Sequence, residues 1–137
     1  MNISASCGRN LEEPGTRKTV VIVEDDPGWC EALKFFFDEA NDFQARAFTD
    51  ARQAWEAIAA SPPDLAILDV VMPALGGQEL AEMMHERGIQ TRVIFLTGLL
   101  TPDETRVRGY RVGNQTVVGK PVNLGLLLEL ARKAVHA

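Results

Sequence analysis

Residues 62–73 read PPDLAILDVVMP. The apolar run 65–68 lies between prolines, and a short run of this kind predicts a strand that is buried on both faces. Asp69 follows the run directly, at the carboxyl end of a strand, where open parallel α/β sheets bind their ligands. An aspartate in a loop can also be a simple turn or capping residue. The interpretation of Asp69 therefore depends on which residues the fold brings close to it.

The composition is that of an ordinary globular domain. With 137 residues, 46% hydrophobic and 24% charged, the chain is long enough to bury a core without disulfides or structural metal. The net charge of −5 argues against a nucleic-acid surface. Cys7 and Cys30 have no metal-ligand spacing, so we expect free thiols. The chain has neither a signal-like apolar segment near its start nor a membrane-spanning apolar run, so we expect a cytoplasmic protein.

Apolar periodicity predicts five strands that alternate with five helices. Residues 1–17 are expected to form a flexible tail, followed by one domain over residues 18–137. The expected strands cover residues 19–23, 43–48, 65–68, 92–96 and 116–119. Helices are expected to begin near Pro27, Asp50, Gly77, Thr101 and Asn123, and the fourth is expected to continue past Gly109. Such alternation is typical of a doubly wound five-stranded parallel sheet with helices on both faces.

Reactive polar side chains follow four of the five expected strands. They are Glu24, Asp25 and Asp26 after the first strand, Asp69 after the third, Thr97 after the fourth and Lys120 after the fifth. Because the carboxyl ends of parallel strands lie along one edge, we expect these side chains to be neighbours. One of the three consecutive acidic residues is expected to cap the following helix.

The chemistry of this set indicates an aspartyl-phosphate site. Crowded carboxylates repel one another unless a cation lies among them, and oxygen ligands on an open edge suit Mg²⁺. Lys120 adds a compact positive charge that can pair with phosphate, and Thr97 adds a hydroxyl donor. Asp69 would then be the nucleophilic carboxylate.

The chain resembles the receiver domain of bacterial response regulators, over residues 18–137. The resemblance is carried by VVIVEDDP (20–27), DLAILDVVMP (64–73), LTG (96–98) and KP (120–121), in the order of the family and close to its spacing. It implies a flavodoxin-like fold and a place in a two-component phosphorelay. Asp69 would accept a phosphoryl group from a histidine kinase or histidine phosphotransfer protein, and the chain would catalyse its own phosphorylation and dephosphorylation.

The resemblance also implies a metal site. Asp25 and Asp69 would bind Mg²⁺, the backbone carbonyl of Val71 would be a third protein ligand, and Glu24 would act mostly through water. Each of these residues follows one of two expected strands, the first or the third.

Further implications concern the phosphoryl group and the output. Thr97 and Lys120 would contact the phosphoryl oxygens, and the peptide bond between Lys120 and Pro121 would be cis. Signalling would proceed by a conformational change at the last two helices, whose faces would serve a homodimer or a downstream protein. No direct contact with nucleic acid or membrane is expected.

The chain departs from the family at three places. The family usually has an aromatic residue three positions before its lysine, where this chain has Val117, so we expect a different switching route. Gly76 and Gly77 replace a common Asp-Gly pair, and we expect them to loosen the start of the third helix. Val71 and Leu99 are apolar where polar residues can help a water molecule to attack, so we expect slow self-dephosphorylation.

The last helix carries apolar residues beyond one core face. Leu126, Leu130 and Ala134 form a second stripe beside the expected core residues. Leucine is a good helix former, so the stripe can reflect helix propensity alone, or it can be a docking or dimer surface.

Three alternatives remain open at this point. A phosphatase of the haloacid dehalogenase type would need a second aspartate two residues after Asp69, where this chain has Val71. A nucleotide-binding or flavodoxin-like domain would need a glycine-rich loop after the first strand, where this chain has acidic residues. A degenerate receiver would act only as a phosphorylation-independent interaction module, and the absence of the aromatic residue at position 117 is compatible with it.

Overall fold

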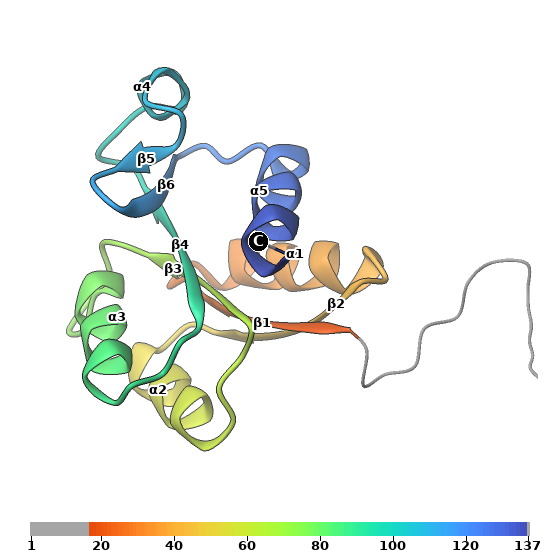
Figure 1. The fold of residues 1–137 in the computed structure, drawn as a ribbon, viewed down its shortest axis with the longest axis vertical. Helices are drawn as coiled ribbons and strands as arrows, with labels where there is room; N and C mark the ends of the chain where they lie inside the picture. The colour runs from red at the N-terminus through yellow and green to blue at the C-terminus, as the bar shows by residue number, and fades with distance from the viewer. Residues whose placement is uncertain (1–16, 137) are drawn as a thin grey trace, which may run out of the picture.

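The computed structural model describes residues 17–136, so the expected tail over residues 1–17 lies outside them except for Arg17. One sheet lies between two layers of helices (Figure 1). The strands are β1 (Lys18–Val23), β2 (Phe43–Phe48), β3 (Leu65–Asp69), β4 (Arg92–Thr97), β5 (Arg111–Val112) and β6 (Gln115–Gly119). The helices are α1 (Pro27–Glu39), α2 (Ala51–Ala60), α3 (Gly77–Glu86), α4 (Pro102–Val107) and α5 (Leu124–His136). None of these helices is both long and apolar enough to cross a membrane.

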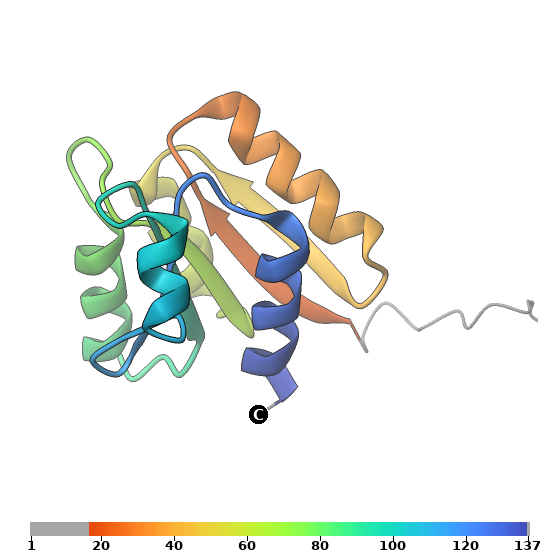
Figure 2. The ribbon, with the colours of Figure 1, turned by 90° about the horizontal axis from the view of Figure 1, so that it is seen from above.

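The strand order is β2-β1-β3-β4-β6-β5, and all neighbours are parallel except β5 and β6. Figure 2 shows the arrowheads of β1 and β2 pointing toward the same edge of the sheet. The expected doubly wound α/β fold with five helices is confirmed. The sheet contains one strand more than expected, because two residues after α4 pair with β6 in an antiparallel hairpin.

Alternating strand residues build a core on each face of the sheet. Ile22, Ile67 and Leu96 point toward the face that α1 and α5 cover. Val23 and Leu68 point toward the opposite face, which α2 and α3 cover. β1 and β3, whose carboxyl ends lead to most of the acidic residues, are thus buried on both faces.

The fourth helix is shorter than expected. α4 ends at Val107, whereas the pattern predicted a helix that continues past Gly109. Gly109 and Tyr110 have φ angles of 65° and 59°, which a right-handed helix does not allow. The expectation of a longer fourth helix was therefore wrong: the glycine that weakens its helix propensity ends it, and the chain turns into β5.

The last helix presents less free apolar surface than the sequence indicated. Leu127 and Ala131 are buried, while the second stripe is half-buried rather than exposed. Leu130 and Ala134 pack against the core on the α1 and α5 face. Leu126 lines an open groove of about 430 Å³ between α4 and α5.

The glycines at the start of α3 allow the helix to pack closely against the end of β3. Gly76 is the N-cap of α3, and its backbone N–H donates to the Glu79 carboxylate at 2.8 Å. Gly77 is buried, and a Cβ atom there would overlap the backbone carbonyl oxygen of Asp69. The first turn of α3 therefore packs directly on the end of β3, which a larger residue would prevent.

We predict that Gly77→Ala lowers the free energy of unfolding by about 1–3 kcal/mol, because the methyl group would force backbone atoms apart at the end of β3. Gly125→Ala is the matched control, since the nearest atom to its new Cβ would be Asn123 Oδ1 at 3.4 Å. This control should be neutral or raise stability by up to about 1 kcal/mol. Urea unfolding of both variants measures the difference, and equal changes would contradict the packing argument.

Candidate functional site

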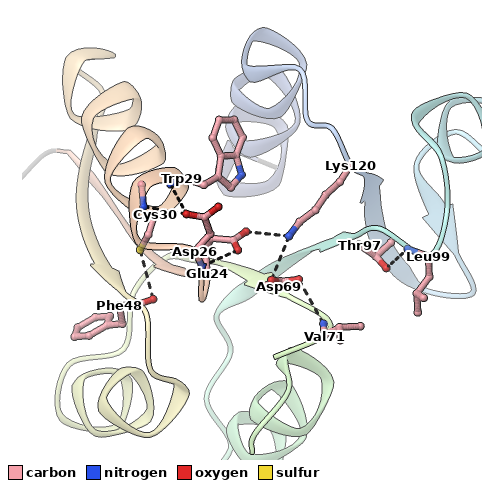
Figure 3. Close-up of polar contacts among 11 residues, drawn as sticks. Glu24, Asp26, Trp29, Cys30, Phe48, Asp69, Val71, Thr97, Leu99 and Lys120 are labelled. Atoms are coloured by element: carbon pink, nitrogen blue, oxygen red, sulfur yellow. Dashed lines mark hydrogen bonds and ion pairs between the residues drawn. The ribbon is translucent and has the colours of Figure 1, made fainter. Parts of the chain in front are cut away.

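The parallel register brings the polar strand ends together at one edge of the sheet. Asp69 is paired with Leu96 on β4, and Thr97 is paired with Gly119, the residue before Lys120. Val23, the last residue of β1, pairs with Leu68, the residue before Asp69. Glu24 follows Val23 and therefore lies next to Asp69. Figure 3 shows the side chains of Glu24, Asp69 and Lys120 converging from three different strand ends.

The Lys120 ammonium lies between two buried carboxylates. Its Nζ atom is 3.1 Å from Glu24 Oε1 and 3.2 Å from Asp69 Oδ2. Only 1% of Glu24 and 3% of Asp69 are exposed to solvent. Burying two carboxylates this deeply is unfavourable unless a positive charge compensates them, and Lys120 is that charge. The prediction that Glu24, Asp69 and Lys120 are neighbours is confirmed.

The ionisation of this group reflects both burial and pairing. Burial raises the pKa of the Glu24 carboxyl above its ordinary value, although the hydrogen bond from Lys120 acts in the opposite direction. Burial tends to lower the pKa of the Lys120 ammonium, but its hydrogen bonds to Glu24 and Asp69 outweigh this and raise the pKa. The pairing with Glu24 and Asp69 therefore favours the charged form of Lys120.

Three carboxylates form a cluster with the geometry of a cation site. Glu24, Asp25 and Asp69 each offer an oxygen, and these atoms lie within 4.8 Å of one another. Asp25 is exposed, so the cluster is open to solvent on one side. Hard oxygen donors at an open edge match the preference of Mg²⁺, which retains several water ligands. The residues present therefore fit a divalent cation.

Asp26 and Val71, which are close in sequence to the cluster residues, are involved in hydrogen bonds of backbone N–H groups. Asp26 caps α1, because its Oδ1 atom accepts the backbone N–H groups of Gly28 at 3.0 Å and Trp29 at 3.3 Å. The expectation that one of the three acidic residues caps the helix is confirmed. The backbone N–H of Val71 lies 3.4 Å from Asp69 Oδ1, so the chain at residue 71 runs close to the candidate phosphoacceptor. The Val71 carbonyl remains a predicted ligand.

Thr97 lies at the same edge but has a different partner. It is buried, and its Oγ1 atom accepts the backbone N–H of Leu99 at 3.0 Å. Among residues 17–136 this hydroxyl makes no hydrogen bond to Asp69 or Lys120, as Figure 3 shows. The backbone of Thr97 is nevertheless linked to the site, because its carbonyl accepts the N–H of Lys120 at 2.7 Å. The lysine and proline that follow are joined by a cis peptide bond, as the resemblance implies.

Sequence reasoning missed one buried polar residue next to this site. Thr105 on α4 is 1% exposed, and its hydroxyl accepts the backbone N–H of Gly119 at 3.1 Å. A threonine within a charged helical segment is a weak signal. Its partner lies 14 residues away, and the pairing depends on how α4 packs against β6.

Comparison with known proteins places this geometry in a family. Residues 20–132 match the model of the response regulator receiver domain. The chain is 30% identical over 106 residues to response regulator Rre1 of Synechocystis, covering 75% of this chain and 45% of that protein. It is 34% identical over 106 residues to response regulator GtcR of Aneurinibacillus migulanus, covering 77% of this chain and 43% of that protein. The chain thus spans less than half the length of these relatives.

Solved structures show the same fold. The receiver domain of Francisella response regulator 1452 aligns with a TM-score of 0.74 at 23% identity, covering 88% of this chain and 98% of that one. A CheY-like receiver domain protein from Methanospirillum hungatei aligns with a TM-score of 0.73 at 24% identity, covering 88% and 94%. With the match to the family model over residues 20–132, these findings establish that the chain belongs to the response regulator receiver domain family of two-component systems.

Proposed function

We propose that Asp69 receives a phosphoryl group from a histidine kinase or a histidine phosphotransfer protein, and that residues 18–137 form the domain that carries this activity. The observation that supports it most directly is the Lys120 ammonium, 3.2 Å from Asp69 Oδ2. A phosphoryl group on Asp69 would add negatively charged oxygens within reach of this ammonium. Lys120 would then stabilise them as a compact positive charge.

In the proposed transfer, a carboxylate oxygen of Asp69 attacks the phosphorus atom of a phosphohistidine. A P–O bond forms, the P–N bond breaks, and the electron pair of that bond stays on the imidazole nitrogen, which solvent can protonate. Lys120 stabilises the phosphoryl oxygens through its charge. Thr97 accepts a hydrogen bond from Leu99, so its own hydroxyl proton remains available for a phosphoryl oxygen.

The acidic cluster supports Mg²⁺ as the cofactor. Asp25 and Asp69 would be direct ligands, the Val71 carbonyl a third, and Glu24 would act mostly through water because its Oε1 atom already faces Lys120. When bound, the ion would neutralise charge that builds up between the carboxylates and the phosphoryl oxygens.

Partner binding through the last two helices is part of the proposal. The groove of about 430 Å³ between α4 and α5 is lined by residues of both helices, including Arg106 and Leu126. A homodimer partner or a downstream protein would bind in this groove. The shape of the groove would change if α4 moved relative to α5.

The family assignment leaves the interaction-only receiver as the main alternative. Val117 occupies the position of the usual aromatic residue and is buried, so the chain lacks the side chain that normally responds to phosphorylation. A protein of this kind would bind its partner equally well with and without a phosphoryl group on Asp69.

We predict that incubation with Mg²⁺ and acetyl phosphate adds one phosphoryl group, detectable by intact mass. Asp69→Asn should abolish the gain, because the amide is not a nucleophile of comparable strength. Asp64→Asn is the matched control, since Asp64 directly precedes the opposite end of β3 and its carboxylate accepts a hydrogen bond from the backbone of Thr19. If neither acetyl phosphate nor a matched kinase adds mass, the interaction-only alternative is favoured.

We also predict that Mg²⁺ raises the thermal midpoint of unfolding, because the ion would bind the folded carboxylate cluster and not the unfolded chain. At ten times its dissociation constant the ion would add about 1.4 kcal/mol of stability. Asp25→Asn should lose most of this gain and be at least as stable as the wild type without the ion, since one repelling charge is removed. Glu56→Gln removes one charge from the exposed side of α2 and should retain the full response.

Slow self-dephosphorylation is the third expectation for this site. Val71 and Leu99 are 60% and 74% exposed, so polar replacements there should not disturb the core. We predict that Val71→Asn combined with Leu99→Asn shortens the lifetime of the phosphorylated form several-fold, measured by the decay of the phosphorylated mass. Val107→Asn changes a valine on α4 that is 77% exposed and should leave the lifetime unchanged. A wild-type half-life of seconds would contradict the expectation.

A further inference from the structure

The helix α4 buries one side chain against the rest of the protein. Thr105 is its only buried residue, and the other residues of α4, in Pro102–Val107, are exposed. A threonine at an otherwise solvated helix is buried at little cost only if its hydroxyl is fully hydrogen-bonded. The partners of this hydroxyl therefore decide what holds α4 in place.

The Thr105 hydroxyl bridges the helix and the end of β6. It donates to the carbonyl oxygen of Pro102 at 3.0 Å and accepts the backbone N–H of Gly119 at 3.1 Å. A second link runs through the backbone: Tyr110 N–H donates to Thr105 O at 2.7 Å, and Val117 N–H donates to Tyr110 O at 2.9 Å. Thr105 is thus connected to β6 at two positions, by its side chain and by its carbonyl group.

The end of β6 that receives this hydroxyl is also the segment that holds the lysine of the site. Gly119 precedes Lys120, and the Lys120 N–H donates to Thr97 O at 2.7 Å. A Cβ atom on Gly119 would lie 2.5 Å from Leu100 O and from Thr101 O. The end of β6 therefore lies close against the loop between β4 and α4.

The residue at the usual switch position has no comparable contact. Val117 is 7% exposed and packs in the core cluster with Phe95. Its short apolar side chain has no polar end that could exchange partners when the site changes. The hydroxyl of Thr105, by contrast, is a polar contact between α4 and the residue next to Lys120.

We propose that Thr105 is a positioning residue that couples Lys120 to α4, so that its hydrogen bond to Gly119 serves as the switching route in place of an aromatic side chain at position 117. The inference rests on the proposed phosphorylation of Asp69. A phosphoryl group would draw Lys120 from Glu24 toward the new oxygens. Because Gly119 is held by Thr105, this movement displaces α4 and alters its groove with α5.

The coupling can be measured from the backbone amide resonances of α4, Asp103 to Val107, in the full chain. Two perturbations are applied at the site: Mg²⁺ with beryllofluoride as a phosphoryl mimic, and the substitution Lys120→Met, which requires no phosphorylation chemistry. Each is applied in the wild type, in Thr105→Val, which removes only the hydroxyl, and in Thr105→Ser, which keeps it. Thr116→Val is the control for removing a threonine hydroxyl elsewhere on β6.

In the wild type and in Thr116→Val, both perturbations should shift the α4 amides. In Thr105→Val these shifts should fall to less than half, while resonances near Asp69 still respond, and Thr105→Ser should restore them. Rescue by serine is the outcome that a purely structural role for the threonine methyl group would not give. Undiminished shifts in Thr105→Val, or no rescue by serine, would overturn the proposal.

Failure of the proposed function gives a different pattern. If beryllofluoride leaves the resonances around Asp69 unchanged, phosphoryl binding is refuted, and the Lys120→Met arm alone decides the coupling. Should Thr105→Val not fold, hydrogen exchange of the Gly119 amide decides it instead. Lys120→Met should shift the α4 amides while the Gly119 amide keeps its protection, because the proposal requires its hydrogen bond to Thr105 to persist. Exchange of the Gly119 amide that is about tenfold faster, the change expected for loss of one hydrogen bond, would exclude the coupling.

Discussion

The contact between the Lys120 ammonium and the carboxylates of Glu24 and Asp69 is the interaction on which the site depends. Both carboxylates are almost completely buried, and a third, Asp25, lies close by. Without a positive charge their mutual repulsion and their desolvation would oppose the fold at the carboxyl edge of the sheet. The lysine supplies that charge from β6, and its backbone is held by Thr97 on β4.

The same contact limits what the site can accept. Three carboxylates and one ammonium carry a net negative charge, and a phosphoryl group on Asp69 would increase it. Lys120 can face the new oxygens only by giving up part of its contact with Glu24, which would leave a buried carboxylate without its partner. A divalent cation among the carboxylates would remove this conflict. The proposed need for Mg²⁺ therefore follows from the excess of negative charge at this buried edge of the sheet.

The strand ends of the site were predictable from the sequence, whereas the contacts around α4 were not. Parallel strands buried on both faces have a strong apolar signal, and their common direction places Glu24, Asp69 and Lys120 together whatever the exact loop lengths. The end of α4 depends on left-handed backbone at Gly109 and Tyr110, which no periodicity reveals. Tight packing, such as that of Gly77 on the carbonyl of Asp69, likewise depends on tertiary distances that residue types do not encode.

A single hydrogen bond is sufficient for the switching role proposed for Thr105. One buried hydrogen bond contributes about 0.5–1.5 kcal/mol, and about 1.4 kcal/mol changes a population ratio tenfold. A helix of six residues with one buried side chain has few other contacts to oppose such a shift. A long helix packed along its whole length would need a bulky side chain to move it, because many contacts would have to change together. The short α4 lowers that requirement, so in the proposed route a hydroxyl group would take the place of an aromatic ring in transmitting the state of Asp69.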